Sequence, residues 1–333
     1  MEWNSNRDKK MRKKKAAAMS GKLTDFRAPS KKFIVTTTIN PPTLATRKFS
    51  AMSGWNLIVV GDTKTPHDEY RKINCTYLHP QDQERLDKEL SDSIGWRTIQ
   101  RRNMGFLFAY SQGAEVIATV DDDNIPYDNW GEELYVGSEI EIDLWKSENG
   151  FFDPLSITNR PDLWHRGYPV EHLKTKNRIE YRGKTKRKVL IQADLWDGDP
   201  DIDAMCRISK NPCVKYDKHS PFGSNQISPF NSQNTFISRE VIPYYMVLPY
   251  IGRMDDIWIG YLIQKQFKNS LIYNKSTVFQ DRNEQDLVVN LENEIIGYRN
   301  TLSFIEGNYR LPEKTQKSYD LYKKAFRLIG GEK

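Results

Sequence analysis

The sequence predicts an α/β protein whose sheet is mostly parallel and flanked by helices. Short apolar runs rich in β-branched residues, over 33–39, 55–60 and 115–120, are typical of buried strands. Helix-length stretches separate these runs, as parallel strands require. Each run also ends in polar residues, and doubly wound sheets bind their ligands at that edge. We therefore expect the functional site to lie where these strands end.

The expected elements follow one another as strand, helix and strand. The first strand stops before Pro41 and Pro42, because proline cannot donate to a sheet ladder. Leu86, Leu90 and Ile94 recur at the spacing of a helix face. In chain order we expect a strand over 33–39, a helix within 43–53, a strand over 55–60, helices over 81–94 and 97–112, and a strand over 115–120.

The later part of the chain is less periodic. It is rich in aromatic and charged residues over 130–215. Its basic segment, 174–188, is expected to form a hairpin or excursion around Arg182-Gly183-Lys184, as a solvated surface loop. Helices are expected over 255–267, 287–305 and 313–329. These patterns divide the chain into a basic tail, 1–32, an α/β domain, 33–285, and a C-terminal helical extension, 286–333.

Positive charge is concentrated in the tail. Residues 1–32 hold eleven Lys and Arg against three Asp and Glu, a net charge of +8, whereas the whole chain carries +6. The rest of the chain is therefore close to neutral, at −2, which argues against a nucleic-acid-binding protein. We expect the tail to be flexible and solvated, with contact to anionic lipid headgroups or RNA as the alternative.

Three features predict the location in the cell. No run approaches the ~20 consecutive apolar residues of a membrane span, and no apolar signal segment follows the N-terminal charges. Cys75, Cys206 and Cys213 are odd in number and lack CxxC spacing, which favours reduced thiols. We expect a cytoplasmic protein whose membrane contact, if any, is peripheral and made by the tail.

Three aspartates directly follow the third strand. Asp121, Asp122 and Asp123 repel one another strongly unless a cation neutralises them. Oxygen ligands without His or Cys suit Mg²⁺ or Mn²⁺, which bridge to substrate phosphates. Alternation along the strand places Asp121 and Asp123 on one side and Asp122 on the other. A metal site is favoured over the alternative, an exposed acidic turn or helix cap.

Other polar residues stand at strand ends or at a helix start. Arg101 and Arg102 begin the helix before the acidic strand, so we expect one to reach a phosphate and the other to face solvent. The alternative is that both are surface residues. The ends of the first two strands supply as further candidate contacts Thr38, Asn40, Asp62 and Lys64.

Trp196, Asp197 and Asp199 belong to a segment with one indole and four carboxylates. An aromatic face beside carboxylates suits a sugar, because the C–H groups stack on the ring while the hydroxyls donate to the acids. The alternative, an EF-hand-like calcium turn, lacks the ligand spacing and the terminal Glu of that motif. The segment therefore predicts a sugar contact.

Four segments together resemble the STELLO-type nucleotide-diphospho-sugar transferase family. They are TTTINPPT (36–43), LIVVGDTKTP (57–66), RRNMGFLFAYSQGAEVIATVDDDNIP (101–126) and LWDGDPDIDA (195–204). The family is related to the plant reversibly glycosylated polypeptides, which act as UDP-arabinopyranose mutases. The resemblance spans roughly residues 33–300. It implies a GT-A fold, in which a DxD motif holds Mn²⁺ or Mg²⁺ together with a nucleotide sugar.

The resemblance also implies roles for individual residues. Asp121 and Asp123 take the metal and the diphosphate, and Asp122 contacts the ribose. The nucleoside pocket is lined by Thr38, Asn40 and Asp62. Because the last histidine of the chain is His219, a third metal ligand must be a carboxylate, a glutamine or water in the segment 280–286.

Two further sites follow from the same resemblance. Residues 164–170 are similar to the RGYP segment of the reversibly glycosylated polypeptides, whose arginine becomes glycosylated. Arg166 occupies that position and is expected to contact a sugar or phosphate. Asp255 and Asp256 are expected to supply the base for the acceptor or to bind the donor sugar, with helix capping as the alternative.

These expectations describe a metal-dependent glycosyltransferase with a UDP-linked donor and a glycan or glycoconjugate acceptor. The metal and an arginine would stabilise the departing diphosphate. Two alternatives stay open: a nucleotide-sugar mutase, and a non-catalytic protein that binds sugar nucleotides as an accessory to a polysaccharide synthase.

Overall fold

A computed structural model describes residues 30–210, 212–282 and 285–330. The basic tail predicted over residues 1–32 lies almost entirely outside these ranges. The strands are β1 (Lys32–Thr38), β2 (Asn56–Gly61), β3 (Thr76–Leu78), β4 (Val116–Val120), β5 (Asn124–Pro126), β6 (Glu139–Ser147), β7 (Ile179–Lys188), β8 (Ile191–Gly198), β9 (Phe222–Ser224), β10 (Asn234–Ser238) and β11 (Leu271–Gln280).

Most of the helices lie close to the predicted ranges, but those at 67–70 and 204–210 were not predicted. They are α2 (Leu44–Ser50), α3 (His67–Tyr70), α4 (Pro80–Leu86), α5 (Lys88–Ile94), α6 (Arg102–Ser111), α7 (Ala204–Lys210), α8 (Asp255–Gln266), α9 (Leu287–Glu306) and α10 (Glu313–Gly330). Short 3₁₀ turns are η1 (Ile99–Arg101), η2 (Pro154–Ile157), η3 (Val170–Thr175), η4 (Ile242–Tyr244) and η5 (Gly252–Met254). Across the described ranges, no helix is both long and apolar enough to cross a membrane.

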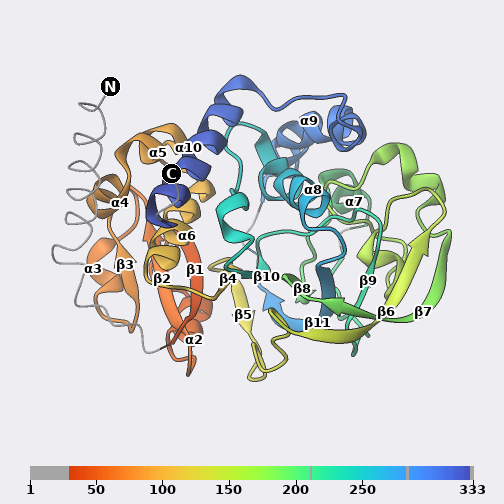
Figure 1. The fold of residues 1–333 in the computed structure, drawn as a ribbon, viewed down its shortest axis with the longest axis horizontal. Helices are drawn as coiled ribbons and strands as arrows, with labels where there is room; N and C mark the ends of the chain where they lie inside the picture. The colour runs from red at the N-terminus through yellow and green to blue at the C-terminus, as the bar shows by residue number, and fades with distance from the viewer. Residues whose placement is uncertain (1–29, 211, 283–284, 331–333) are drawn as a thin grey trace, which may run out of the picture.

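One mixed sheet runs through the molecule in the order β3-β2-β1-β4-β10-β8-β11-β9-β6-β7. The four strands from β3 to β4 pair in parallel, and so do β8 and β11. The short strand β10 joins these two parallel groups by pairing antiparallel with both β4 and β8. Helices α4, α5, α6 and α10 gather at the β1–β3 end, and α7, α8 and α9 at the other half (Figure 1). The predicted α/β fold is confirmed.

Two local predictions need correction. The helix expected over 81–94 is two helices, because Asp87 adopts an extended conformation and caps α5 by accepting from the Leu90 amide. The hairpin expected at Arg182-Gly183-Lys184 is absent from the described structure. Those residues lie inside the continuous strand β7, which pairs with β6. Gly183 has φ +83° at an irregularity of that ladder, so its signal marks a bulge and not a turn.

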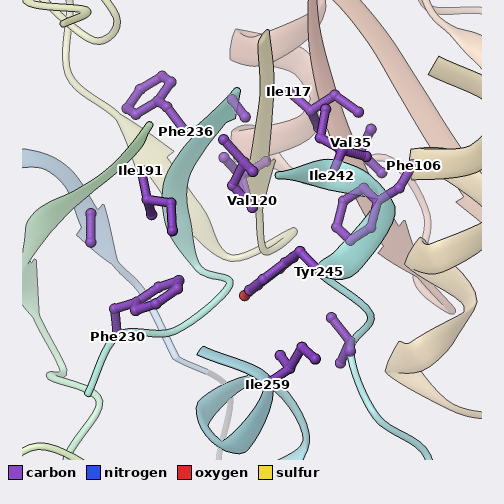
Figure 2. Close-up of a cluster of buried hydrophobic side chains, with 14 of the residues drawn as sticks. Val35, Phe106, Ile117, Val120, Ile191, Phe230, Phe236, Ile242, Tyr245 and Ile259 are labelled. Atoms are coloured by element: carbon purple, nitrogen blue, oxygen red, sulfur yellow. The ribbon is translucent and has the colours of Figure 1, made fainter. Parts of the chain in front are cut away.

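Helix α6 packs closely on the parallel strands because it carries a glycine. A Cβ on Gly105 would lie 2.5 Å from Val35 and 2.7 Å from Val60. The same helix contributes Phe106 to the cluster in Figure 2, where Tyr245 lies between Phe106 and Phe230. This packing connects the parallel strands to the later half of the chain.

The C-terminal helices belong to the same core. Phe304 of α9 and Tyr322 and Phe326 of α10 are buried in it. The Tyr322 hydroxyl donates to the carbonyl oxygens of Ile242 and Tyr245, at 2.9 Å each. The segment predicted as an extension therefore packs as part of the α/β domain.

Candidate active site

A polar cavity of about 650 Å³ opens at the carboxyl ends of β1 and β4 and faces the start of α8. This is the edge at which the sequence predicts a site. The wall carries six carboxylates and five arginines. They are Asp121, Asp122, Asp123, Asp201, Asp255, Asp256, Arg97, Arg102, Arg166, Arg253 and Arg282.

In the acidic turn after β4, Asp121 and Asp122 bind different partner residues. Asp121 pairs with Arg102. Asp122 accepts from the hydroxyl of Thr38 and from Asn40 Nδ2 at the end of β1. Thr38 and Asn40 thus fix Asp122, in place of lining the cavity wall themselves.

Asp123 is the carboxylate whose charge is least compensated in this turn. Its buried Oδ1 has no hydrogen-bond partner. Burial and then the nearby Asp121 raise the pKa of Asp123 to about 7. A cation between Asp121 and Asp123 would remove both penalties, so the donor set fits a hard divalent ion.

The turn alone does not complete a metal site. In the described parts of the chain, no group of three or more His, Cys, Asp and Glu is placed to hold a metal. Gln280, in the segment predicted to supply a third ligand, does line the cavity.

Gly198 allows β8 and β11 to approach closely next to Gln280. It has φ +88°, and a Cβ there would lie 2.5 Å from the Gln280 carbonyl oxygen.

Two of the candidate contacts at the strand ends do not reach the cavity wall. Asp62 lies outside the cavity wall, because its Oδ2 accepts from the amides of Arg97, at 2.7 Å, and Thr98, at 3.2 Å. Its role is to hold the loop that brings those two residues to the wall. Lys64 is exposed and is not among the wall residues.

The two adjacent arginines lie in different surroundings, and the predicted contact with a phosphate stays a prediction. Arg102 lines the cavity and donates to Asp121, Thr119 and Ser232. Arg101 does not face solvent. It is fully buried, donates to Gln83 Oε1 and stacks 3.8 Å from the centre of the Trp96 ring. Arg101 therefore supports the helix that presents Arg102.

Arg166 lines the cavity and is held on several sides, and its expected contact with a sugar or phosphate stays a prediction. Its Nε and Nη2 each lie 2.8 Å from a carboxylate oxygen of Asp201, and its Nη1 donates to Asp256 at 3.0 Å. Its Nη1 also donates to the carbonyl oxygen of Arg253. The guanidinium is buried among these partners, so Arg166 positions the acidic residues around it.

The acid pair at the start of α8 is asymmetric. Asp256 accepts from Arg166 and from the amide and hydroxyl of Ser232. Burial alone would raise the pKa of Asp256, but Arg166 lowers it below its usual value. Asp255 accepts from Gln100 Nε2 at 2.7 Å and lies 3.8 Å from Arg166. Burial and then Asp256 raise the pKa of Asp255 to about 7, which suits a proton acceptor near neutral pH.

Trp196, Asp197 and Asp199, which were predicted to contact a sugar, are not among the wall residues. Trp196 is buried between the rings of His165 and Tyr216. Asp197 accepts from the Tyr127 hydroxyl, and Asp199 pairs with Arg207 and Arg282. The member of the segment that reaches the wall is Asp201.

Sequence reasoning missed four wall residues that hold or complete the site: Gln100, Asp201, Ser232 and Arg282. Asp201 stood among the four carboxylates of the Trp196 segment, but nothing in the pattern distinguished it from its neighbours. The other three carry no spacing or composition signal.

Fold and cavity together define an α/β protein with a polar ligand site at the carboxyl edge of its parallel strands. Within that class, the chain is similar to two curated proteins of Arabidopsis thaliana. It is 25% identical to "Probable glycosyltransferase STELLO2" over 256 residues and 24% identical to "Probable glycosyltransferase STELLO1" over 261 residues. Each match covers 71% of this chain and 33% of the relative. The resemblance predicted from the motifs is confirmed, and the chain spans about a third of these relatives.

Two other comparisons add little. No family model matches the chain. Among solved structures, glucosyl-3-phosphoglycerate synthase from Mycobacterium tuberculosis, in complex with phosphoglyceric acid, has a TM-score of 0.44 and 13% sequence identity. That match covers 91% of this chain and 85% of the other, but the likeness is too weak to support an assignment.

Proposed function

We propose that this protein is a glycosyltransferase that takes a sugar from a nucleoside-diphosphate donor, UDP-linked, with the help of Mg²⁺ or Mn²⁺. The carrying observation is that one cavity is lined by both the turn Asp121–Asp123 and the pair Asp255–Asp256. Both curated relatives carry the word glycosyltransferase in their names, which supports the proposal.

Asp121, Asp123 and Gln280 are the residues that would hold the divalent ion. When bound, the ion supplies positive charge that stabilises the departing diphosphate. We assign the ribose hydroxyls to Asp122, which is fixed by Thr38 and Asn40.

Sugar transfer needs a proton acceptor on the acceptor side of the cavity. The acceptor hydroxyl oxygen forms a bond to the anomeric carbon, the bond from that carbon to the diphosphate oxygen breaks, and the hydroxyl proton goes to Asp255. Arg166 and Ser232 hold Asp256 in its charged form, which keeps the proton on Asp255. The acceptor is a glycan or glycoconjugate hydroxyl.

Product analysis tests this proposal. The protein with Mn²⁺, a panel of UDP-sugars and sugar acceptors should yield free UDP and a glycosylated acceptor in equal amounts. A ring-isomerised nucleotide sugar without UDP release would identify a mutase. No product from any UDP-sugar would favour an accessory binding protein and contradict the proposal.

The structure argues against a mutase in which Arg166 itself carries the sugar. All three Arg166 nitrogens donate to buried acceptors, so none is free to carry a sugar.

Cytoplasmic location stays a prediction. So does contact of the tail with anionic membrane, because the tail lies almost wholly outside the described residues.

A further inference from the structure

Arg282 differs from the other arginines of the cavity wall. Its side chain is only 7% exposed, yet its Nε and Nη2 have no hydrogen-bond acceptor. Buried guanidinium groups normally have their N–H donors satisfied, because leaving them unpaired costs free energy. An unpaired buried donor group in a cavity indicates a missing acceptor.

The neighbours of Arg282 do not supply that acceptor. Asp199 Oδ2 lies 3.3 Å from Arg282 Nε, which pairs the charges without a hydrogen bond of good geometry. Asp199 is also neutralised by Arg207, which donates to its other oxygen. Arg282 therefore has positive charge and directed donors available to a ligand.

The other cavity arginines are held by more partners or are more exposed, although Arg102 Nε also lacks a hydrogen-bond acceptor. Arg166 is held by Asp201, Asp256 and a carbonyl, and Arg253 Nε donates to Glu294 at 2.8 Å. Arg97 is exposed to solvent, where water satisfies it. Both terminal nitrogens of Arg102 donate hydrogen bonds, to Asp121, Thr119 and Ser232.

We infer that Arg282 binds a phosphoryl group, namely the diphosphate of the donor. A guanidinium fork matches two phosphate oxygens, and binding there requires no existing hydrogen bond of Arg282 Nε or Nη2 to break. The inference rests on the proposed function for the identity of the ligand, and it adds a residue that positions the leaving group. A phosphate carried by the acceptor would offer the same chemistry.

Calorimetry with Arg282→Gln tests the inference. With Mn²⁺ present, UDP binding to Arg282→Gln should be about 10- to 100-fold weaker than to wild type, the usual effect of losing hydrogen bonds to a charged group. Uridine, which has no phosphate, should bind both proteins alike. Arg282→Lys should fall between them, because it keeps the charge and loses the fork. Arg310→Gln, an exposed arginine outside the wall, is the matched control and should bind UDP as wild type does.

Three results would overturn the inference. Arg282→Gln could bind UDP as tightly as wild type, or it could lose uridine and UDP equally, which would indicate a structural role. Pyrophosphate could bind wild type alongside UDP without competing, which would place the phosphoryl site on the acceptor side.

Failure of the proposed donor would be seen separately. If wild type binds no uridine nucleotide, pyrophosphate with Mn²⁺ is the probe. A rise in the melting temperature of wild type that Arg282→Gln lacks would support the phosphoryl site. An equal rise in both, or none in either, would contradict it.

Discussion

Asp255→Asn should lower the rate of sugar transfer by about 10² to 10⁴, the usual range for losing a general base. Donor affinity should be nearly unchanged, because in the proposed function the acidic turn and the arginines hold the diphosphate. Asn can still accept from Gln100, which at present donates to Asp255 at 2.7 Å, so the local structure should persist. Transfer rate and UDP affinity of the purified variant measure both effects.

The pH dependence gives a second reading of the same residue. Asp255 must be ionised to accept a proton, and its pKa is raised to about 7 by burial and Asp256. The wild-type rate should therefore rise with pH through about 7, and the residual rate of Asp255→Asn should lack that step.

The free energy of unfolding should change with pH in the direction opposite to the transfer rate, because both depend on the ionisation of Asp255. Because the folded pKa lies above the unfolded one, ionisation of Asp255 costs stability as pH rises from about 4 through 7. The free energy of unfolding of Asp255→Asn, compared with that of wild type, should thus be more favourable at pH 8 than at pH 5.

If Asp255→Asn kept wild-type turnover and the pH step in its rate, Asp255 would have no role in the mechanism.

Arg166→Met should destabilise the fold by about 3–5 kcal/mol, the cost of breaking a buried ion pair from one side. Its removal leaves Asp201 and Asp256 buried without their counter-charge. Unfolding by urea, followed by fluorescence, measures the change. Arg178→Met is the matched control, since its pair with Glu148 is exposed and should contribute under about 1 kcal/mol.

The pH dependence of this loss has a definite sign. Burial alone would raise the pKa of Asp201, but Arg166 lowers it well below its usual value. The stability from this pair is then present above the unfolded pKa, about 4, and is lost as pH falls below it. The difference between wild type and Arg166→Met should shrink at acid pH. A difference below about 1 kcal/mol at pH 7 would mean that the acidic residues do not depend on Arg166.

The fold was predictable where local signals agree. β1, β2 and β4 are apolar runs with polar ends, and α8, α9 and α10 begin within a residue of the predicted positions. The pairing of β10 was not predictable, because a five-residue strand that bridges two parallel groups is selected by tertiary contacts and not by its own pattern. The break between α4 and α5 depends on the conformation of one residue, Asp87.

The site was predictable where several charges recur at one strand end or helix start. Asp121–Asp123 and Asp255–Asp256 were found in this way, and they do meet at one cavity. The sequence could not show which of two adjacent arginines faces the cavity, since that depends on how the helix is rotated. It also could not separate Asp201 from Asp197 and Asp199, because the chain leaves strand geometry at Gly198, with φ +88°. Arg282 belongs to no motif, and the inference about it depends on its buried Nε and Nη2, which have no hydrogen-bond acceptor.

The central claim is that the cavity binds a nucleoside diphosphate through a divalent ion held by Asp121 and Asp123. Asp123→Asn is the cleaner variant, because changing Asp121 would also deprive Arg102 of its buried partner. It removes a carboxylate whose buried Oδ1 has no donor, so the fold should be at least as stable at pH 8.

The deciding measurement is a calorimetric titration of UDP into wild type and Asp123→Asn, each with and without Mn²⁺. The account predicts that Mn²⁺ tightens UDP binding to wild type by about tenfold or more, equivalent to roughly 1.4 kcal/mol. It predicts no such gain in Asp123→Asn. Equal UDP affinity in all four titrations would contradict the metal-dependent donor site.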